Sequence, residues 1–228
     1  MTLRLDHLLV AGPDLASARA HVATHLGGTP VDGGRHAGFG THNALVGLAE
    51  GAYLEAVAPD PTQPDGGPFA RALAGLDAPA LVAWCVATDA PDALARRLDA
   101  LGTPATTVAM ERRTPAGERL AWTLTFAAPD GETAAPFFIH WGDTPHPATR
   151  LPVAATLRDL EVTTPDAPRL RAWLRALGLD DPRTSVRDGP ERALRASFDG
   201  ARGPATLRGP ARAMADPDAA SGDPPQAP

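Results

Sequence analysis

RLDHLLVAGPD, residues 4–14, is the most informative stretch of the chain, because its pattern recurs twice. TLRDLEVTTPD, residues 156–166, aligns with it without a gap, and AWCVATDAPD, residues 83–92, lies between the two. The Pro-Asp pairs of the three blocks end at 14, 92 and 166, so the steps are 78 and 74 residues. Each block reads as a strand that runs into a helix, and a repeat of this length is a whole supersecondary unit. The sequence therefore predicts a sheet built by duplication of one module, with a shared concave face for a site.

The first block also indicates how its strand and helix are arranged. Leu5, His7 and Leu9 alternate onto one face, because successive side chains of a strand point to opposite faces. Asp14 is the predicted N-cap of the helix, and Gly27 follows its last turn. We expect the face that carries His7 to line the common cup.

The chain is predicted to be an α+β protein made of βαβββ modules. The first two modules, at about residues 3–60 and 80–142, form one domain over residues 1–150. Residues 154–208 begin with a strand and an amphipathic helix but continue with short, arginine-rich strands, which predicts a partial third module. Residues 209–228 consist largely of Ala, Pro, Asp and Gly, so they are predicted to be a disordered tail.

Two polar segments are predicted to lie outside the core. Residues 32–40 are rich in glycine and are predicted to form a loop before the strand at 41–48. The order βαβββ then requires a short strand at 30–31. The run Glu-Arg-Arg at 111–113 is interpreted as a solvated face at a strand end.

Composition excludes several classes of protein. No apolar run approaches the roughly 18 residues of a membrane span, and residues 1–6 resemble a first strand, not a signal peptide. The net charge of −6 argues against a nucleic-acid binder, which needs a basic surface. Cys85 is the only cysteine, so no disulfide forms within the chain and a reducing cytoplasm is the expected location. The glycine-rich segment is not a phosphate-binding pattern, and we expect no nucleotide cofactor.

Several motifs carry a family resemblance. Leu5-Asp6-His7 on the first strand and Tyr53-Leu54-Glu55 at the end of the first module resemble the vicinal-oxygen-chelate (VOC) superfamily, which includes glyoxalase I, extradiol dioxygenases and fosfomycin-resistance proteins. More narrowly, GRH at 34–36, GTHNAL at 40–45 and PFFIHW at 136–141 are similar to bacterial glyoxalase-like domain proteins. The resemblance implies a cupped barrel of paired modules. It does not imply one reaction, because the superfamily spans many activities.

The resemblance also implies a divalent metal inside the cup, with ligands from the first and last strands of each module. Carried over by position, these ligands are His7, Glu55 and His140. The first strand of the second module offers only Ala-Trp-Cys at 83–85, which departs from the family pattern. The ligand set of two histidines and a carboxylate suits Fe, Mn, Ni or Zn and leaves coordination positions open.

Two functions stay open on this basis. The first is a small-molecule enzyme of the lyase, isomerase or dioxygenase type, in which the metal chelates adjacent substrate oxygens and Glu55 acts as catalytic base. The second is a metal-free protein that binds or sequesters a small molecule without catalysis. In that case His7 and Glu55 are hydrogen-bonded partners in the core.

Four further residues are candidates for substrate contact. His42 and Asn43 lie on a predicted strand, and the Asn43 amide both donates and accepts hydrogen bonds. Arg35 in the glycine-rich segment can bind an anionic group, and Trp141 can line an apolar pocket. Barrel pairing in the superfamily implies a homodimer, although the third module offers a surface that can block it.

Overall fold

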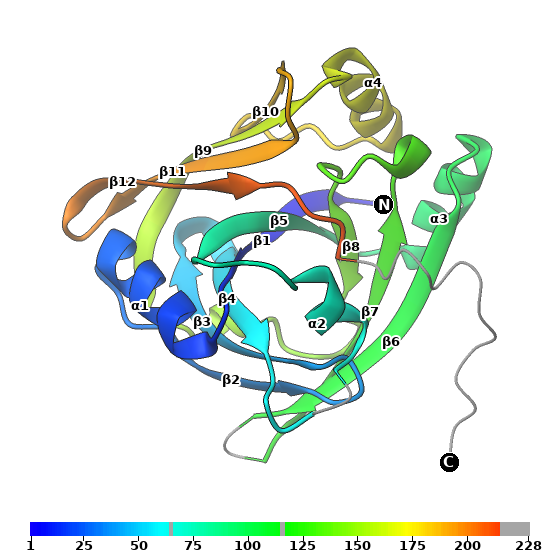
Figure 1. Cartoon of the computed structure of the whole chain (residues 1–228). Helices are drawn as coiled ribbons and strands as arrows, with labels where there is room; N and C mark the ends of the chain where they lie inside the picture. The colour runs from blue at the N-terminus through cyan, green and yellow to red at the C-terminus, as the bar shows by residue number, and fades with distance from the viewer. Residues whose placement is uncertain (64–65, 115–116, 215–228) are drawn as a thin grey trace.

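The computed structural model describes residues 1–63, 66–114 and 117–214, and Figure 1 shows its course. Three segments follow one another, each with a strand, a helix and three further strands. The first comprises β1 (Leu3–Ala11), α1 (Leu15–Leu26), β2 (Val31–His36), β3 (Thr41–Leu48) and β4 (Tyr53–Pro59). The second comprises β5 (Ala80–Thr88), α3 (Pro91–Ala100), β6 (Ala105–Arg113), β7 (Arg119–Ala127) and β8 (Phe137–His140). The third comprises β9 (Val153–Thr164), α4 (Ala167–Leu177), β10 (Thr184–Asp188), β11 (Ala193–Gly200) and β12 (Gly203–Pro210).

Short helices complete the connections between these elements. The helix α2 (Pro68–Ala72) lies in the linker between the first two segments. Single 3₁₀ turns occupy Ala49–Gly51, Pro129–Gly131 and Pro147–Thr149. None of the helices in the described part of the chain is long and apolar enough to cross a bilayer.

The strands form a curled sheet that does not close. They hydrogen-bond in the order β12-β11-β9-β3-β4-β1-β5-β8-β7-β6, with β2 added to β3 and β10 added to β9. In the first segment β1 pairs in parallel with β4, and in the second β5 pairs in parallel with β8. The antiparallel pairing of β1 with β5 joins the two segments. The result is the predicted α+β fold with a cupped, barrel-like sheet (Figure 1).

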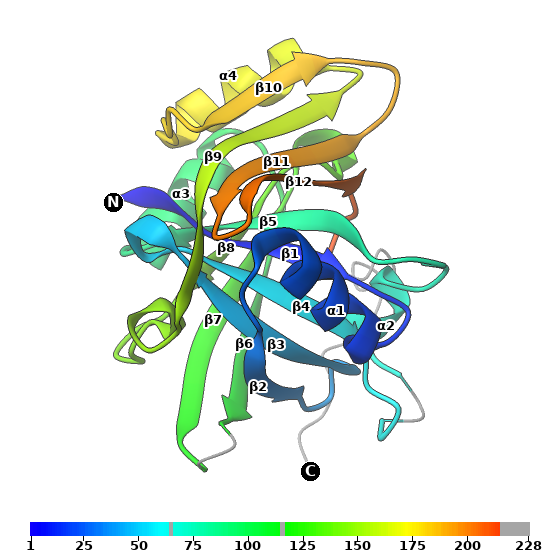
Figure 2. The same ribbon diagram turned by 90° about the vertical axis from the view of Figure 1, so that its left-hand side faces the viewer.

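The third segment lies against the outer side of this cup (Figures 1 and 2). Its first strand, β9, pairs in parallel with β10 and antiparallel with β11, and not with its own last strand. Apolar side chains of β9, α4, β11 and β12 share one core cluster with outward-facing side chains of β1, β4 and β5. The third segment therefore covers the convex face, and the concave face belongs to the first two segments.

The predicted limits of the first helix agree with the structure. The Asp14 side chain accepts a hydrogen bond of 2.7 Å from the backbone N–H of Ser17, as an N-cap does. Gly27 follows the last turn at φ 78°, a left-handed conformation that glycine adopts without steric cost. These local signals fix where α1 begins and ends.

A bulge in β1 decides which side chains face the concave side. Leu5 and His7 pair with consecutive residues of β5, so Asp6 is an extra residue in the ladder. As a consequence Leu5 packs in the outer core, whereas His7 and Leu9 line the concave side. The prediction that Leu5 shares a face with His7 is wrong for this reason.

The glycine-rich segment is partly a strand, because residues 31–36 form β2 at the edge of the sheet. The predicted short strand at 30–31 is therefore longer, and the predicted loop over 32–40 is shorter. The strands β2 and β6 flank the opening of the cup. Across that opening the guanidinium of Arg112 donates a hydrogen bond to the carbonyl oxygen of Gly33.

The predicted disordered tail starts too early. Residues 209–214 are ordered: Gly209 and Pro210 end β12, and the backbone N–H of Arg212 donates to the carbonyl of Val82 at 2.8 Å. Met214 is buried and reaches the concave face. The remainder of the predicted tail, 215–228, lies outside the described residues.

Candidate functional site

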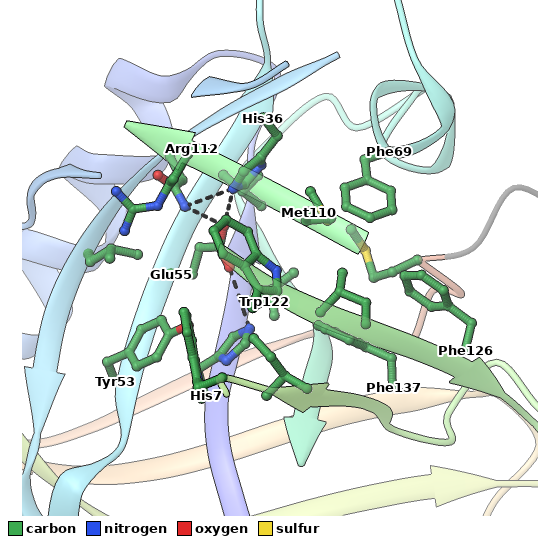
Figure 3. Close-up of a pocket in the computed structure, with 18 residues that line it drawn as sticks. His7, His36, Tyr53, Glu55, Phe69, Met110, Arg112, Trp122, Phe126 and Phe137 are labelled. Atoms are coloured by element: carbon green, nitrogen blue, oxygen red, sulfur yellow. Dashed lines mark hydrogen bonds and ion pairs between the residues drawn. The ribbon is translucent and has the colours of Figure 1, made fainter. Parts of the chain in front are cut away.

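The concave face holds an open pocket, and the space within it and at its solvent-filled mouth amounts to about 530 Å³. Figure 3 shows its two ends, with His36, Glu55 and Arg112 near one and Phe69, Phe126 and Phe137 near the other. The polar lining residues are His7, His36, Asn43, Tyr53, Glu55 and Arg112. The remainder are Leu9, Leu45, Val57, Phe69, Met110, Trp122, Leu124, Phe126, Phe137, Ile139, Trp141 and Met214. A pocket of this size with few polar groups at one end suits a small apolar molecule with a polar head.

Glu55 is the centre of the polar end. Its side chain is buried, and its Oε1 accepts a hydrogen bond of 2.8 Å from the Asn43 amide. The other oxygen, Oε2, lies 3.5 Å from Nε2 of His7, and Nε2 of His36 lies 4.0 Å from Oε1. Alternation along β4 places Glu55 on the concave face with Tyr53 and Val57. The carboxylate is thus held between two imidazoles and an amide.

Asp6 supports His7 from behind. Its fully buried carboxylate lies 2.7 Å from Nδ1 of His7. The second oxygen accepts from Nε1 of Trp141 at 3.0 Å and lies 3.0 Å from Nε2 of His146. Burial alone would raise the pKa of Asp6, but the hydrogen bonds from His146 and His7 outweigh it and hold that pKa below its ordinary value. An ionised Asp6 directs Nε2 of His7 towards Glu55.

Two neighbouring rings are kept neutral by burial. Burial lowers the pKa of His36, whose Nδ1 lies 2.8 Å from the hydroxyl of Thr41. Burial also raises the pKa of Tyr53, whose ring stacks on His7 with centroids 4.5 Å apart. His36 and Tyr53 therefore contribute polar contact without charge near neutral pH.

Arg112 is the cation of the pocket. It is only 7% exposed, and its guanidinium bonds to the Gly33 carbonyl. Burial lowers its pKa, and the electrostatic interactions of Arg112 with Tyr53 and Glu55 partly oppose this effect. Arginine nonetheless keeps its proton in proteins. The interpretation of residues 111–113 as a solvated face is therefore wrong for Arg112, because alternation along β6 turns it inward with Met110.

The structure brings four of the predicted site residues together. His7, Glu55, Asn43 and Trp141 all line the pocket. They come from β1, β4, β3 and the residue after β8, so their proximity depends on the sheet topology. Trp141 also packs at 5.5 Å from the ring of Trp122.

Three predicted residues lie elsewhere. His140 does not line the pocket; its Nδ1 lies 3.0 Å from the carbonyl oxygen of Thr88. Arg35 is more than half exposed and pairs with Asp60 outside the pocket. His42 alternates with Asn43 on β3 and so points to the other face. In this arrangement neither Arg35 nor His42 lines the pocket in which the substrate contact was expected.

The predicted metal centre requires ligand atoms of His7, Glu55 and His140 to meet around one point. His7 and Glu55 present ligand atoms 3.5 Å apart, which two ligands of one ion allow, but His140 does not join them. Asp6, His7 and Cys85 bring one ligand atom each within 4.8 Å of one another. Asp6 and His7 are already hydrogen-bonded to each other, and Cys85 does not line the pocket. The residues present therefore do not fit a metal held by His7, Glu55 and His140.

Several residues of the site are absent from the predicted set. Asp6 and Arg112 were not predicted, because neither the bulge in β1 nor the close approach of β6 to β2 has a clear signal in the sequence. Alternation was the signal that could have found Arg112, since Met110 and Arg112 share a face of β6. His146 lies directly before the turn at Pro147–Thr149, and only the tertiary structure brings it to Asp6.

Sequence comparison places the chain in a family. Residues 5–178 match the profile of the Glyoxalase-like domain, which is more than half of the chain and extends through α4. The chain belongs to the glyoxalase-like domain family. Its fold is that of the VOC superfamily, as the motifs predicted. Among proteins with curated descriptions none matches.

Several solved structures are similar to the chain, and the first of the following three, which has the highest TM-score, supports the fold. A hypothetical protein from Staphylococcus aureus is 16% identical at a TM-score of 0.65, over 93% of this chain and 89% of that chain. Methylmalonyl-CoA epimerase from Mycobacterium tuberculosis is 24% identical at a TM-score of 0.44, over 64% of this chain and 91% of that chain. A Streptomyces coelicolor methylmalonyl-CoA epimerase is 19% identical at a TM-score of 0.47, over 63% of this chain and 98% of that chain. At these identities the likeness concerns the fold and not the reaction.

Proposed function

We propose that this glyoxalase-like protein is a small-molecule enzyme of the isomerase or lyase type that moves a proton with Glu55. The observation that carries the proposal is the placement of Glu55 at the polar end of a largely apolar pocket, 3.5 Å from a histidine that is itself hydrogen-bonded to a buried aspartate. A carboxylate beside such a histidine can accept a proton and pass it on. The apolar walls exclude water and bind the body of the substrate.

The reaction would begin at a C–H bond next to a substrate carbonyl. Glu55 takes the proton, the electron pair forms a C=C bond, and the carbonyl oxygen receives the negative charge. Return of the proton to the opposite face or to another carbon gives an isomer, and departure of a neighbouring group gives the lyase product. His7 shares the proton with Glu55, while Asn43 fixes the orientation of the carboxylate.

A dioxygenase has less support, because it depends on a metal held by two histidines and a carboxylate, and His140 lies outside the pocket. The metal-free binding protein is the second candidate. The predominance of apolar side chains in the lining favours it. Homodimerisation and a cytoplasmic location stay predictions from the sequence.

The test is solvent proton exchange. A panel of small carbonyl compounds is incubated with the protein in D₂O, and deuterium at the adjacent carbon is measured by NMR. We expect exchange with part of the panel and a loss of roughly 10²-fold or more in Glu55→Gln, which is the typical contribution of a general base. Glu111→Gln, on the exposed face of β6, is the matched control.

Metal is measured in the same samples. Exchange that needs no added metal supports proton transfer by protein side chains. If no compound exchanges although apolar ligands bind, the binding protein is the correct alternative. If exchange survives in Glu55→Gln, the role of this carboxylate is wrong.

A further inference from the structure

The buried cation Arg112 points to the chemical class of the substrate. Its side chain lines the pocket and is only 7% exposed. Taking a charge out of water costs several kcal/mol unless it is paired. Within the described residues no carboxylate lies within 4.0 Å of this guanidinium, so the protein itself supplies no direct ion pair.

The hydrogen bonding of Arg112 also indicates that its guanidinium lacks partners within the protein. A guanidinium carries five N–H donors in a planar fork. In the described part of the chain the only acceptor bonded to it is the Gly33 carbonyl. That bond spans the opening between β2 and β6. It uses only one of the five N–H donors, so a purely structural role for Arg112 would leave the other four without an acceptor in the described part of the chain.

Glu55 does not supply the missing acceptor for Arg112. It is the opposite charge that acts on Arg112 through space, yet its oxygens already bond to Asn43 and lie near His7. A ligand that supplies its own oxyanion would satisfy the remaining N–H groups.

We propose that Arg112 binds a carboxylate of the substrate, while the apolar part of the substrate packs against the wall formed by β6, β7 and β8. This deepens the proposed function and rests on it, because it names the substrate class of the same pocket. A carboxylate is favoured over a phosphate dianion because Arg112 is the only arginine among the described lining residues and Glu55 opposes a second negative charge. Arginine binds carboxylate through two parallel hydrogen bonds, which also fixes the orientation of the ligand.

The test compares acids with their amides. Arylalkyl carboxylates from phenylacetate to 6-phenylhexanoate, and the corresponding primary amides, are titrated into the full chain by calorimetry at neutral pH. We expect at least one acid to bind about tenfold more tightly than its amide, because charge-assisted bidentate hydrogen bonds are roughly twice as strong as neutral ones. An amide that binds as tightly as its acid throughout the series overturns the proposal, and so does a series in which no acid binds.

Arg112→Gln and Arg113→Gln form a matched pair. Both remove one positive charge from neighbouring positions of β6, but Arg113 is exposed and bonds to the Gly117 carbonyl. We expect Arg112→Gln to abolish the preference for the acid and Arg113→Gln to keep it. A preference that survives in folded Arg112→Gln contradicts the proposal. If loss of the Gly33 bond prevents folding of that variant, the comparison of acid and amide in the wild type still decides.

The proposal and the proton-transfer function fail differently. Acids that bind preferentially without any deuterium exchange support the Arg112 site and contradict the enzyme. Exchange that is confined to neutral carbonyl compounds supports the enzyme and contradicts the Arg112 site. Glu55→Gln should keep the preference for acids, because Arg112 supplies it.

Discussion

The two βαβββ modules that form the pocket have equivalent frameworks and different chemistry. In the first, His7 is opposite Tyr53 in the parallel pairing of β1 with β4, and Glu55 lies two residues further on. At the equivalent positions of β5 and β8 the second module has Cys85, Phe137 and Ile139. Duplication thus provides the same scaffold twice, and substitution has made one wall polar and the other apolar.

This difference explains the asymmetry of the pocket. The first module supplies His7, His36, Asn43, Tyr53 and Glu55. The second supplies the apolar lining residues Met110, Trp122, Leu124, Phe126, Phe137 and Ile139, with Arg112 as its cation. A bound molecule therefore meets acid–base groups on one side and aromatic surface on the other. Substitutions in the polar wall and substitutions in the apolar wall should therefore affect the protein in different ways.

The largest effect is expected from Asp6→Asn, which removes the charge beneath the polar wall. Loss of a buried charge that serves three partners should lower the free energy of unfolding by about 3–5 kcal/mol at pH 7. Because the folded-state pKa of Asp6 lies below its unfolded value, this stabilisation is present above about pH 4 and is lost as the pH falls. Urea unfolding from neutral to acidic pH measures it, and the gap between wild type and variant should shrink on acidification.

Asp99→Asn, on the exposed side of α3, is the control and should change little. A gap for Asp6→Asn that is constant with pH would show that the carboxylate is not ionised as inferred here.

Gly33→Ala tests the support of Glu55. A Cβ at this position would lie 2.1 Å from Oδ1 of Asn43, so the Asn43 amide must shift and its hydrogen bond to Glu55 is disturbed. We expect a loss of about 1–3 kcal/mol in stability, as for an overpacked site, together with slower deuterium exchange. In an Asn43→Ala background the same substitution should cost little stability, because the clash is gone. Equal costs in both backgrounds would mean that Asn43 is not the residue displaced.

Phe126→Leu tests the apolar wall. Phe126 stacks on Phe137 at 5.7 Å and meets Phe69 at 5.8 Å. Loss of these aromatic contacts should weaken ligand binding by about 1 kcal/mol. The effect should be equal for acids and amides, because the substitution leaves Arg112 in place. Calorimetry of matched pairs measures it, and a change in the preference for acids would show that the two walls do not act independently.

The smallest effect is expected from His140→Ala. Because this side chain bonds to the Thr88 carbonyl outside the pocket, the variant should lose about 1 kcal/mol of stability at most. Metal content and deuterium exchange should equal those of the wild type, whereas His7→Ala should slow exchange. A loss of bound metal in His140→Ala would restore the metal centre that the family pattern implied.

The case of His140 shows where prediction by position fails. The resemblance transferred a ligand to the last strand of the second module, and the site residue there is Ile139, one position earlier. A shift of one residue moves a side chain to the opposite face of a strand. Motif comparison cannot fix a register of one residue. His7 and Glu55 were carried over by position in the same way, and both line the pocket.

Arg112 and Asp6 illustrate a second limit. Charged side chains are usually solvated. No local signal marks Asp6 as buried, and alternation with Met110 is the one local sign for Arg112. Asp6 is buried because a bulge inserts it into β1 next to His7. Arg112 is buried because the cup curls until β6 reaches Gly33 of β2.

What the amino-acid pattern decided was therefore the module, its repetition and the strands that carry His7 and Glu55, since periodicity and turn residues act over a few positions. The tertiary structure decided which charges are buried, where the third segment packs and which residues from seven strands meet in one pocket. Those features depend on strand pairing between residues far apart in the chain, and the free energy of burying a charge is set by partners that only the folded sheet brings together.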